Sequence, residues 1–437
     1  MKILCLCDSP TLNSGFARVA QNLFKRWARY GAKIDVWGIC FMGWGYKEHT
    51  YINEFFPAGA GGEWCAANRL NIFLQQLAQG GYTHVWIMQD TFLLVNHGFP
   101  AALKSVCTAK GIRSMLYFPV DAPLKPEWTD ILAAVDVPVA YTEFGKAEAL
   151  EKYATRMRSV IAANTPAGET PKEFEMLDIA VLPHGVDTTI YRPISDRMAE
   201  RERFWAEPWV SPDDFLMVNL NSNQRRKDVS RSLEILKAVR ELGVPAKLVM
   251  HMSALSDGDV NLEVVGQQLG LPVTMKGKPG VWAHHSQLFH QGQGSLPELP
   301  TAENPASLLQ LYNICDLYLT TTLGEGWGLG ITEALACGTP VALPWHTACA
   351  EIGNYLIINC KMDNIVRLPC EYGGMVQEMD NSRLRPRVDV RDAAKAIKAY
   401  YDSGHWRERQ GLTQPSREWL NWDRIAREML NLLKKKK

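Results

Sequence analysis

The chain reads LYLTTTLGEGWGLGITEALACGTP from residue 317 to residue 340. An apolar strand pattern over residues 317–321 runs into a glycine-rich turn, and the spacing after the turn predicts a short helix over residues 331–337. Gly338 and Pro340 stop that helix, because glycine accepts a left-handed backbone and proline cannot continue a helix. Strand, tight turn and helix in this order predict an α/β fold that binds a ligand at the helix N-terminus.

Short apolar runs alternate with helical patterns along most of the 437 residues, which is typical of parallel sheets covered by crossover helices. The predicted strands of the first half are residues 2–7, 33–39, 84–88, 114–118, 137–141 and 179–182. Those of the second half are residues 215–220, 246–251, 273–276, 317–321 and 340–343. A charged stretch without a strand pattern, residues 191–214, separates the two series and therefore marks a domain junction.

A chain of 437 residues is too long for one hydrophobic core, so two large domains are expected. We place a Rossmann-like domain over residues 1–200 and a second over residues 201–410. Within residues 411–437 apolar side chains from Trp419 to Leu433 recur every three or four positions, which predicts a C-terminal helix packing back on the body. Residues 278–300 show no period and indicate an inserted loop.

Composition excludes several classes of protein. Lys plus Arg and Asp plus Glu both number 47, so no overall field points to a polyanionic partner. No apolar run approaches the ~20 residues of a membrane-spanning helix, and the first apolar run ends at Asp8, too early for a signal peptide. The ten cysteines show no framework spacing, which favours reduced thiols and a cytoplasmic location.

The glycine-rich turn carries the most informative chemistry. Backbone amides around Gly328, Leu329 and Gly330 would converge at a helix N-terminus, which favours a phosphate there. Glu325 and Glu333 flank these amides, and carboxylates accept hydrogen bonds from sugar hydroxyls rather than from phosphates. Either glutamate alone could merely cap a helix, but the whole loop suits a diphosphate with a sugar on each side, which is a nucleotide sugar.

Two glutamates separated by seven residues around a glycine-rich loop, followed by Ala-Leu-Ala-Cys-Gly-Thr-Pro, resemble the retaining GT-B glycosyltransferases of family 4. The resemblance implies two Rossmann-like parallel-sheet domains facing a cleft, the first on the acceptor side and the second binding the nucleotide sugar. It implies that Glu325 contacts hydroxyls of the transferred sugar, that residues 328–330 contact sugar and phosphate, and that Glu333 holds the ribose.

Further segments resemble motifs of this family and occur in the same order along the chain. Gly15 and Phe16 follow the first strand, where the resemblance implies a loop beside the donor phosphates. His184 lies in a Pro-His-Gly-Val-Asp segment near the implied cleft, either as a donor contact or as a structural histidine. Arg226 and Lys227 follow the first strand of the second half, where two cations would neutralise charge on a departing diphosphate. The alternative for this basic pair is a solvated surface.

The sequence departs from the family pattern at two places. Val120 stands where the family has a histidine near the reacting sugar, which leaves Asp121 as the acidic candidate there. Residues 221–222 are Asn-Ser where the family commonly has Gly-Arg, so the diphosphate arginine must be Arg225 or Arg226.

The resemblance implies transfer on the face of the leaving group, with no bound metal and no cofactor. Double displacement would need a carboxylate on the opposite face of the sugar, for which Asp121 is the candidate. His284, His285 and His290 could suggest a metal, but no Cys or carboxylate falls at a zinc spacing with them, which favours a loop.

Other functions and several acceptors stay open. A sugar-nucleotide epimerase is disfavoured because the two-glutamate loop belongs to transferases, and a phosphorylase because no context of a pyridoxal-binding lysine is found. A non-catalytic sugar-binding protein is the third alternative. The acceptor could be a glycan or a small molecule, contacted by aromatic residues within 41–46, Phe55, Phe56 or Trp64. The segment Asp-Ser-Pro-Thr-Leu-Asn-Ser-Gly resembles transferases encoded by bacteriophages, some of which glycosylate hydroxymethylated DNA bases. Such a base is therefore a further candidate acceptor.

Overall fold

The computed structural model describes residues 1–12, 14–39, 49–58, 69–166, 169–204, 211, 213–252, 260–271, 273–274, 281–283, 305–377 and 383–435. The chain divides into two compact units. Unit 1 comprises Met1–Gly185 together with Leu420–Lys437, and unit 2 comprises Val186–Trp419. The junctions therefore fall at residues 185 and 419, where the sequence placed them at 200 and 410.

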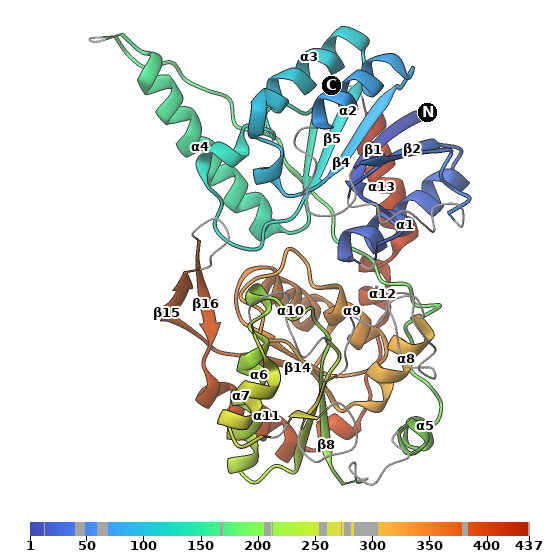
Figure 1. Ribbon diagram of the computed structural model, residues 1–437, viewed down its shortest axis with the longest axis vertical. Helices are drawn as coiled ribbons and strands as arrows, with labels where there is room; N and C mark the ends of the chain where they lie inside the picture. Colours follow the sequence, from blue (N-terminus) through green and yellow to red (C-terminus); the bar gives the residue numbers. More distant parts are fainter. Residues whose placement is uncertain are drawn as a thin grey trace. The chain divides into compact units, whose positions relative to one another are not determined.

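Unit 1 is built on a seven-stranded parallel sheet of order β3-β2-β1-β4-β5-β6-β7 (Figure 1). Its strands are β1 (Lys2–Asp8), β2 (Lys33–Ile39), β3 (Glu54–Ala58), β4 (His84–Met88), β5 (Arg113–Phe118), β6 (Val137–Ala140) and β7 (Ala180–Val181). Every strand predicted for the first half is present. The edge strand β3 was not predicted, and Phe55 and Phe56, expected in a loop, lie in it.

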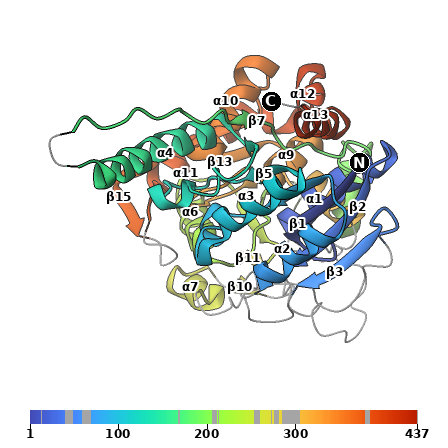
Figure 2. The same cartoon turned by 90° about the horizontal axis from the view of Figure 1, so that it is seen from above.

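Helices cover both faces of this sheet. They are α1 (Gly15–Arg29), α2 (Leu70–Gln79), α3 (Phe99–Lys110), α4 (Glu143–Asn164) and α13 (Trp422–Lys434). Leu4 and Leu6 of β1 share a core with α2 and α3, which lie side by side in Figure 2. Helix α1 begins where the Ser14 hydroxyl accepts from the amide of Ala17 at 3.0 Å, and it buries Trp27 completely.

Helix α13 brings the end of the described chain back to unit 1. In Figure 1 the red α13 lies beside the blue α1, and the Trp27 indole N–H donates to the Ala426 carbonyl at 3.0 Å. The sequence predicted one helix through Trp419, but the structure breaks it. Trp419 ends α12 (Gln414–Trp419), and the Asn421 side chain caps α13 by accepting from the amide of Asp423 at 2.8 Å.

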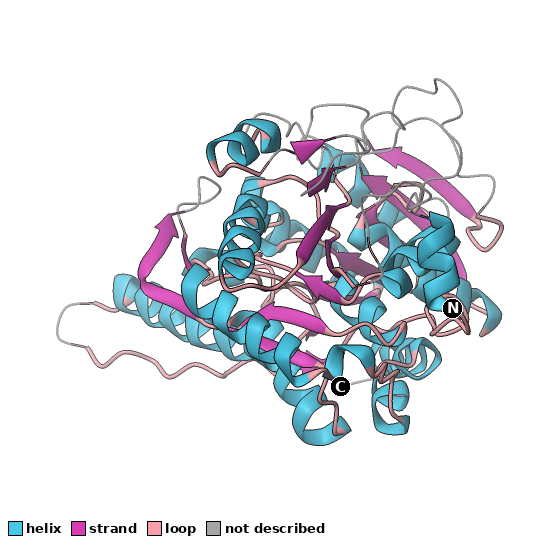
Figure 3. Cartoon of the chain, turned by 90° about the horizontal axis from the view of Figure 1, so that it is seen from below, coloured by secondary structure: helices cyan, strands magenta, loops and turns pink. Residues whose placement is uncertain are grey.

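Unit 2 contains a second seven-stranded parallel sheet, of order β10-β11-β9-β8-β12-β13-β14. Figure 3 shows the strands in magenta among cyan helices. The strands are β8 (Phe215–Asn219), β9 (Ala246–Met250), β10 (Val273–Thr274), β11 (Val281–Ala283), β12 (Leu317–Leu319), β13 (Val341–Pro344) and β14 (Ile365–Leu368), with a hairpin of β15 (Cys370–Gln377) and β16 (Leu384–Val388). The helices are α5 (Arg197–Phe204), α6 (Val229–Glu241), α7 (Leu262–Gln268), α8 (Pro305–Ile314), α9 (Leu329–Ala336), α10 (Thr347–Cys360), α11 (Val390–Ser403) and α12.

Unit 2 contains four strands that the sequence analysis did not predict: β11, β14 and the two strands of the hairpin, β15 and β16. Residues 281–283 form β11, although the sequence predicted a loop there, because a three-residue strand is too short to show a period. The remaining residues of the predicted insertion, 278–280 and 284–300, lie outside the described residues.

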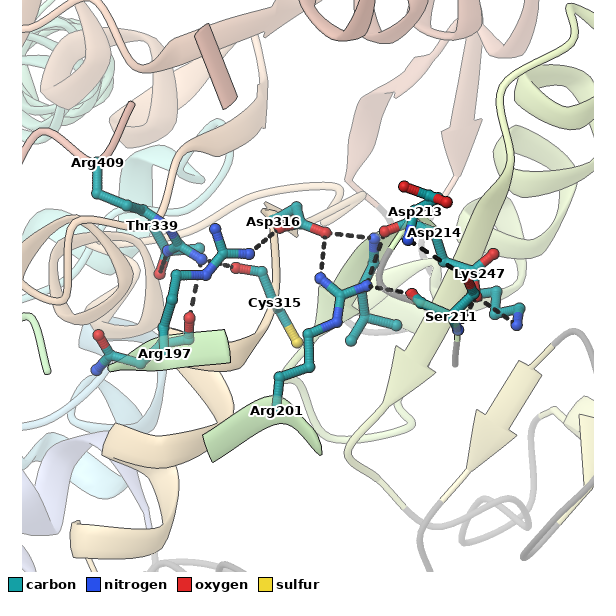
Figure 4. A network of polar contacts seen from close by, with 12 residues as sticks. Arg197, Arg201, Ser211, Asp213, Asp214, Lys247, Cys315, Asp316, Thr339 and Arg409 are labelled. Carbon is teal, nitrogen blue, oxygen red and sulfur yellow. Dashed lines mark hydrogen bonds and ion pairs between the residues drawn. The ribbon is translucent and has the colours of Figure 1, made fainter. Parts of the chain in front are cut away.

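A buried carboxylate joins three parts of unit 2 at the edge where its strands begin. Asp316, with no exposed surface, directly precedes β12 and accepts from the amide of Leu216 in β8 at 2.8 Å. Its carboxylate also accepts from Arg201 at 2.8 Å and from Arg197, both on α5, and Arg409 lies in the same network (Figure 4). The two central strands and α5 are therefore fixed to one another by a single side chain.

We expect Asp316→Asn to destabilise the protein by about 3 kcal/mol, because it leaves buried arginines without their counter-charge. Thermal unfolding followed by circular dichroism measures the change. Asp402→Asn is the matched control, since Asp402 pairs with Lys398 on the surface of α11 with 54% of its side chain exposed. An equal loss of stability in the two variants would contradict the assigned role of Asp316.

Candidate active site

Backbone geometry at the start of α9 explains why this loop needs glycine. Gly328 has a φ of 93°, a conformation that residues with a side chain rarely adopt. At Gly330 a Cβ atom would lie 2.6 Å from the Tyr318 hydroxyl, so any side chain would force Tyr318 away. Helix α9 starts two residues before the prediction, at Leu329. Its first amides therefore lie beside the turn, at the edge where the strands end.

Two cations and a carboxylate meet beside this turn. The Nζ atom of Lys227 is in direct contact with Oε1 of Glu325, and Nη1 of Arg226 lies 3.5 Å from Oε2 of the same carboxylate. Arg226 also donates to the Gly324 carbonyl at 2.6 Å. The side chains of Lys227 and Glu325 are each 12% exposed, and that of Arg226 is 27% exposed. The structure thus brings together three residues that the sequence singled out separately.

The strand end that precedes the turn holds the basic loop by its backbone. The Arg226 carbonyl accepts from the amide of Leu323 at 2.7 Å and from the Thr322 hydroxyl at 3.3 Å. The Thr321 hydroxyl donates to the Asp228 carbonyl at 2.9 Å. These contacts fix the positions of the cations before any ligand arrives. The sequence analysis missed these threonines, although three in a row after a strand were the available signal.

Asp228 and Arg387 anchor the same loop from the other side. Asp228 has a φ of 42°, and its carboxylate takes a bidentate contact from Arg387 of β16 at 2.6 and 2.8 Å. This hydrogen bonding raises the pKa of the Arg387 guanidinium above its usual value. Because the two residues lie 159 positions apart, no local sequence pattern could have paired them.

Electrostatics in the cluster favour a ligand with negative charge. Burial lowers the pKa of Lys227, Arg226 lowers it further, and the carboxylate of Glu325 opposes both effects. Arg225 is exposed, whereas Arg226 contacts the glycine loop. Of the two arginines that the sequence offered for a diphosphate, Arg226 is therefore the one placed at the turn.

Glu333 lies one turn into α9. Its side chain is 6% exposed and accepts from the Tyr312 hydroxyl at 3.0 Å. The Tyr312 contact holds the carboxylate in one orientation, which suits a side chain that accepts from ligand hydroxyls. Its assignment to a ribose stays a prediction.

The remaining predicted site residues belong to unit 1. Gly15 is the first residue of α1 and is exposed, and Phe16 next to it is half-buried. Asp121 is half-buried and follows β5. All three lie after the carboxyl ends of their strands, where open α/β sheets bind ligands. Their roles stay predictions.

His184 is enclosed by aromatic rings. Its side chain is 3% exposed, and its ring centroid lies 4.3 Å from that of Tyr141 and 6.0 Å from that of Trp422. The Tyr117 hydroxyl lies 2.7 Å from Nδ1 of His184 and donates its proton to the Leu182 carbonyl at 2.9 Å. The buried imidazole thus has a polar partner at Nδ1. Burial lowers the pKa of His184 to about 3.

The neutral state of His184 predicts a pH-dependent loss of stability. Below pH ~6.5 the unfolded chain binds a proton at this residue that the folded chain rejects, so stability falls as the pH falls. We expect the destabilisation by His184→Gln to be roughly 2–3 kcal/mol smaller at pH 4.5 than at pH 7. Urea unfolding at the two pH values measures this difference. A substitution cost that does not change with pH would show that His184 is not held neutral.

Clusters of metal ligands and membrane-spanning helices are both missing from the described residues. They hold no group of three or more His, Cys, Asp or Glu side chains that could bind a metal ion. Over the same ranges, none of the helices has the length and apolar character needed to cross a membrane. His284, His285 and His290 lie outside the described residues.

Comparison with known sequences gives a partial match. No family model matches the chain. The GDP-mannose-dependent alpha-(1-6)-phosphatidylinositol dimannoside mannosyltransferase of Mycobacterium tuberculosis (strain ATCC 25177 / H37Ra) is 25% identical over 212 residues, which are 47% of this chain and 47% of that protein. The same protein of strain CDC 1551 / Oshkosh matches equally. The chain thus spans about half the length of the curated relatives it matches.

Comparison with solved structures extends over the whole chain. Sucrose-phosphate synthase from Thermosynechococcus elongatus has a TM-score of 0.65 at 13% identity, covering 99% of this chain and 98% of that one. A glycosyltransferase from Rickettsia africae has a TM-score of 0.64 at 13% identity, covering 99% and 97%. An E. coli structure described as trehalose-6-phosphate bound with UDP-2-fluoro glucose has a TM-score of 0.60 at 13% identity, with full coverage of both. These likenesses confirm the predicted α/β class and the GT-B fold.

Proposed function

We propose that this chain is a retaining, metal-independent glycosyltransferase that moves a sugar from a nucleoside-diphosphate sugar to an acceptor hydroxyl. The observation that carries the proposal is the contact of Glu325 with Arg226 and Lys227 beside the glycine turn. Two cations and helix amides suit a diphosphate, and an acceptor-only carboxylate between them suits sugar hydroxyls. The proposal needs no cofactor.

The compared proteins support the choice of donor class. One relative is named as GDP-mannose-dependent, and one solved structure is described as bound with UDP-2-fluoro glucose. Both compounds are sugars on a nucleoside diphosphate. GDP-mannose and UDP-glucose are therefore the first donors to test.

The proposed reaction breaks the bond between the anomeric carbon and a diphosphate oxygen. The electron pair leaves with the diphosphate, where Arg226 and Lys227 stabilise the added negative charge. The acceptor oxygen attacks the same face of the sugar, and a phosphate oxygen takes the hydroxyl proton. Glu325 and the amides of residues 328–330 orient the sugar, and Glu333 binds the ribose. In the rival double displacement Asp121 would act as the nucleophile.

Release of the free nucleoside diphosphate from each donor, with and without excess chelator, tests the function. We expect release to persist with chelator and the product to keep the donor's anomeric configuration, seen by NMR before the anomers equilibrate. The acceptors to screen are glycans, small hydroxyl compounds and DNA with hydroxymethylated bases. An inverted product would exclude the retaining mechanism, and binding of a donor without release would identify a sugar-binding protein.

We expect Arg226→Ala and Lys227→Ala each to lower turnover by roughly 10²–10³, as when one preorganised charge-stabilising group is lost. Steady-state turnover at saturating donor measures the effect. Arg225→Ala is the matched control, because Arg225 is the exposed neighbour on the same short helix, η6 (Arg225–Lys227). If all three variants keep wild-type turnover, the basic run is only a solvated surface.

Glu325→Gln should change the binding of the nucleoside diphosphate product and the rate of sugar transfer in opposite directions. The substitution removes the carboxylate that competes for Arg226 and Lys227, so a free nucleoside diphosphate should bind several-fold more tightly. Transfer should fall, because the sugar loses an acceptor for its hydroxyls. Calorimetric titration with UDP and GDP checks the first effect. Weaker binding of both diphosphates would contradict the competition.

A further inference from the structure

His346 lies at the same edge of the sheet as the candidate site but was not predicted to belong to it. Strands β12 and β13 are parallel neighbours, with Tyr318 paired to Val341. Glu325 follows β12 and His346 follows β13, so both lie beyond the carboxyl ends of adjacent strands. Burial of Cys349, in the first turn of α10, is the main cause of its raised pKa, and the charge of Glu325 adds to it. Helix α10 therefore begins beside this cluster.

The imidazole of His346 keeps one nitrogen unused. The residue is 4% exposed, and its Nδ1 atom lies 3.2 Å from the Thr347 hydroxyl. Over the described ranges, its Nε2 atom is buried and has no hydrogen-bond partner. His346 is the N-cap residue of α10, yet its side chain makes no capping bond. A buried polar atom without a partner destabilises a fold, so this nitrogen requires an explanation.

The backbone that presents His346 is strained. Thr347 has a φ of 47°, although a β-branched residue disfavours the left-handed region. Such outliers persist where the surrounding structure enforces them, and they cluster at ligand sites. Here the strain lies immediately after the residue with the unused nitrogen.

The charge state of His346 indicates which kind of ligand group its ring would bind. Burial lowers its pKa to about 4, a hydrogen bond of the ring to the Thr322 backbone raises it, the charge of Arg385 lowers it, and the charge of Glu325 raises it. The ring is therefore neutral near pH 7, with one nitrogen that donates and one that accepts. A phosphate prefers the cations already present at Arg226 and Lys227, whereas a hydroxyl can serve either nitrogen.

We propose that Nε2 of His346 hydrogen-bonds a hydroxyl of the transferred sugar, beside the hydroxyls held by Glu325. The proposal rests on the proposed function and adds a residue that contacts the sugar and not the nucleotide. His346 would then set which hydroxyl pattern the donor sugar must carry.

His346→Leu tests the proposal, because leucine fills the space without a polar atom. Calorimetric titration compares UDP-glucose with UDP and GDP-mannose with GDP. We expect the affinity for the bound sugar nucleotide to fall roughly five- to tenfold, as for one lost hydrogen bond. The affinity for the matching diphosphate should stay within about twofold, since it lacks the sugar.

Two further measurements separate this role from a structural one. His346→Leu should keep the thermal midpoint, because it removes an unsatisfied buried nitrogen, whereas a structural histidine would lower it. His346→Gln, whose amide both donates and accepts, should recover part of the lost affinity. Equal losses for sugar nucleotide and diphosphate, or no loss for either, would overturn the proposal. If the wild-type chain binds neither sugar nucleotide, the proposed function fails first and this assignment fails with it.

Discussion

The contact between the Asp316 carboxylate and the amide of Leu216 determines where the rest of unit 2 can lie. It joins the beginnings of β12 and β8, and Arg197 and Arg201 hold α5 to the same carboxylate. Because the strands are parallel, fixing their first residues relative to each other also fixes where their carboxyl ends lie along the strand direction. The threonines after β12 and the basic loop after β8 therefore meet in register.

The two charged clusters of unit 2 differ in the partners of their carboxylates. At Asp316 the carboxylate receives hydrogen bonds from both arginines and from the backbone, which suits a permanent joint. At Glu325 the partners are two side chains that a diphosphate can also bind. At Glu325 the two cations can therefore exchange one anion for another. This contrast separates the network at Asp316 from the proposed binding site at Glu325.

The sequence predicted the class of fold because hydrophobic periodicity and glycine turns are local signals. It also singled out Glu325, Arg226 and Lys227, each of which follows a recognisable strand, and the structure brings these three residues into contact. It missed contacts between distant segments, such as the pairing of Asp228 with Arg387, since no local pattern reports them. His346 escaped notice for another reason. A histidine before a helix is unremarkable until burial shows that one of its nitrogens lacks a partner.

The packing of α13 in unit 1 affects the order in which the two units can fold during translation. The ribosome releases residues 1–185 long before residues 420–435, so the first unit emerges without one of its helices. Until α13 has been synthesised, the Trp27 indole N–H lacks its acceptor, the Ala426 carbonyl, and the apolar surface that α13 covers is exposed to solvent. The joint is closely fitted, since a Cβ at Gly185 would lie 2.6 Å from the Trp422 ring. All of unit 2 is thus synthesised before unit 1 is complete, and the apolar surface that α13 will cover is exposed during that interval, which is the kind of surface that promotes aggregation.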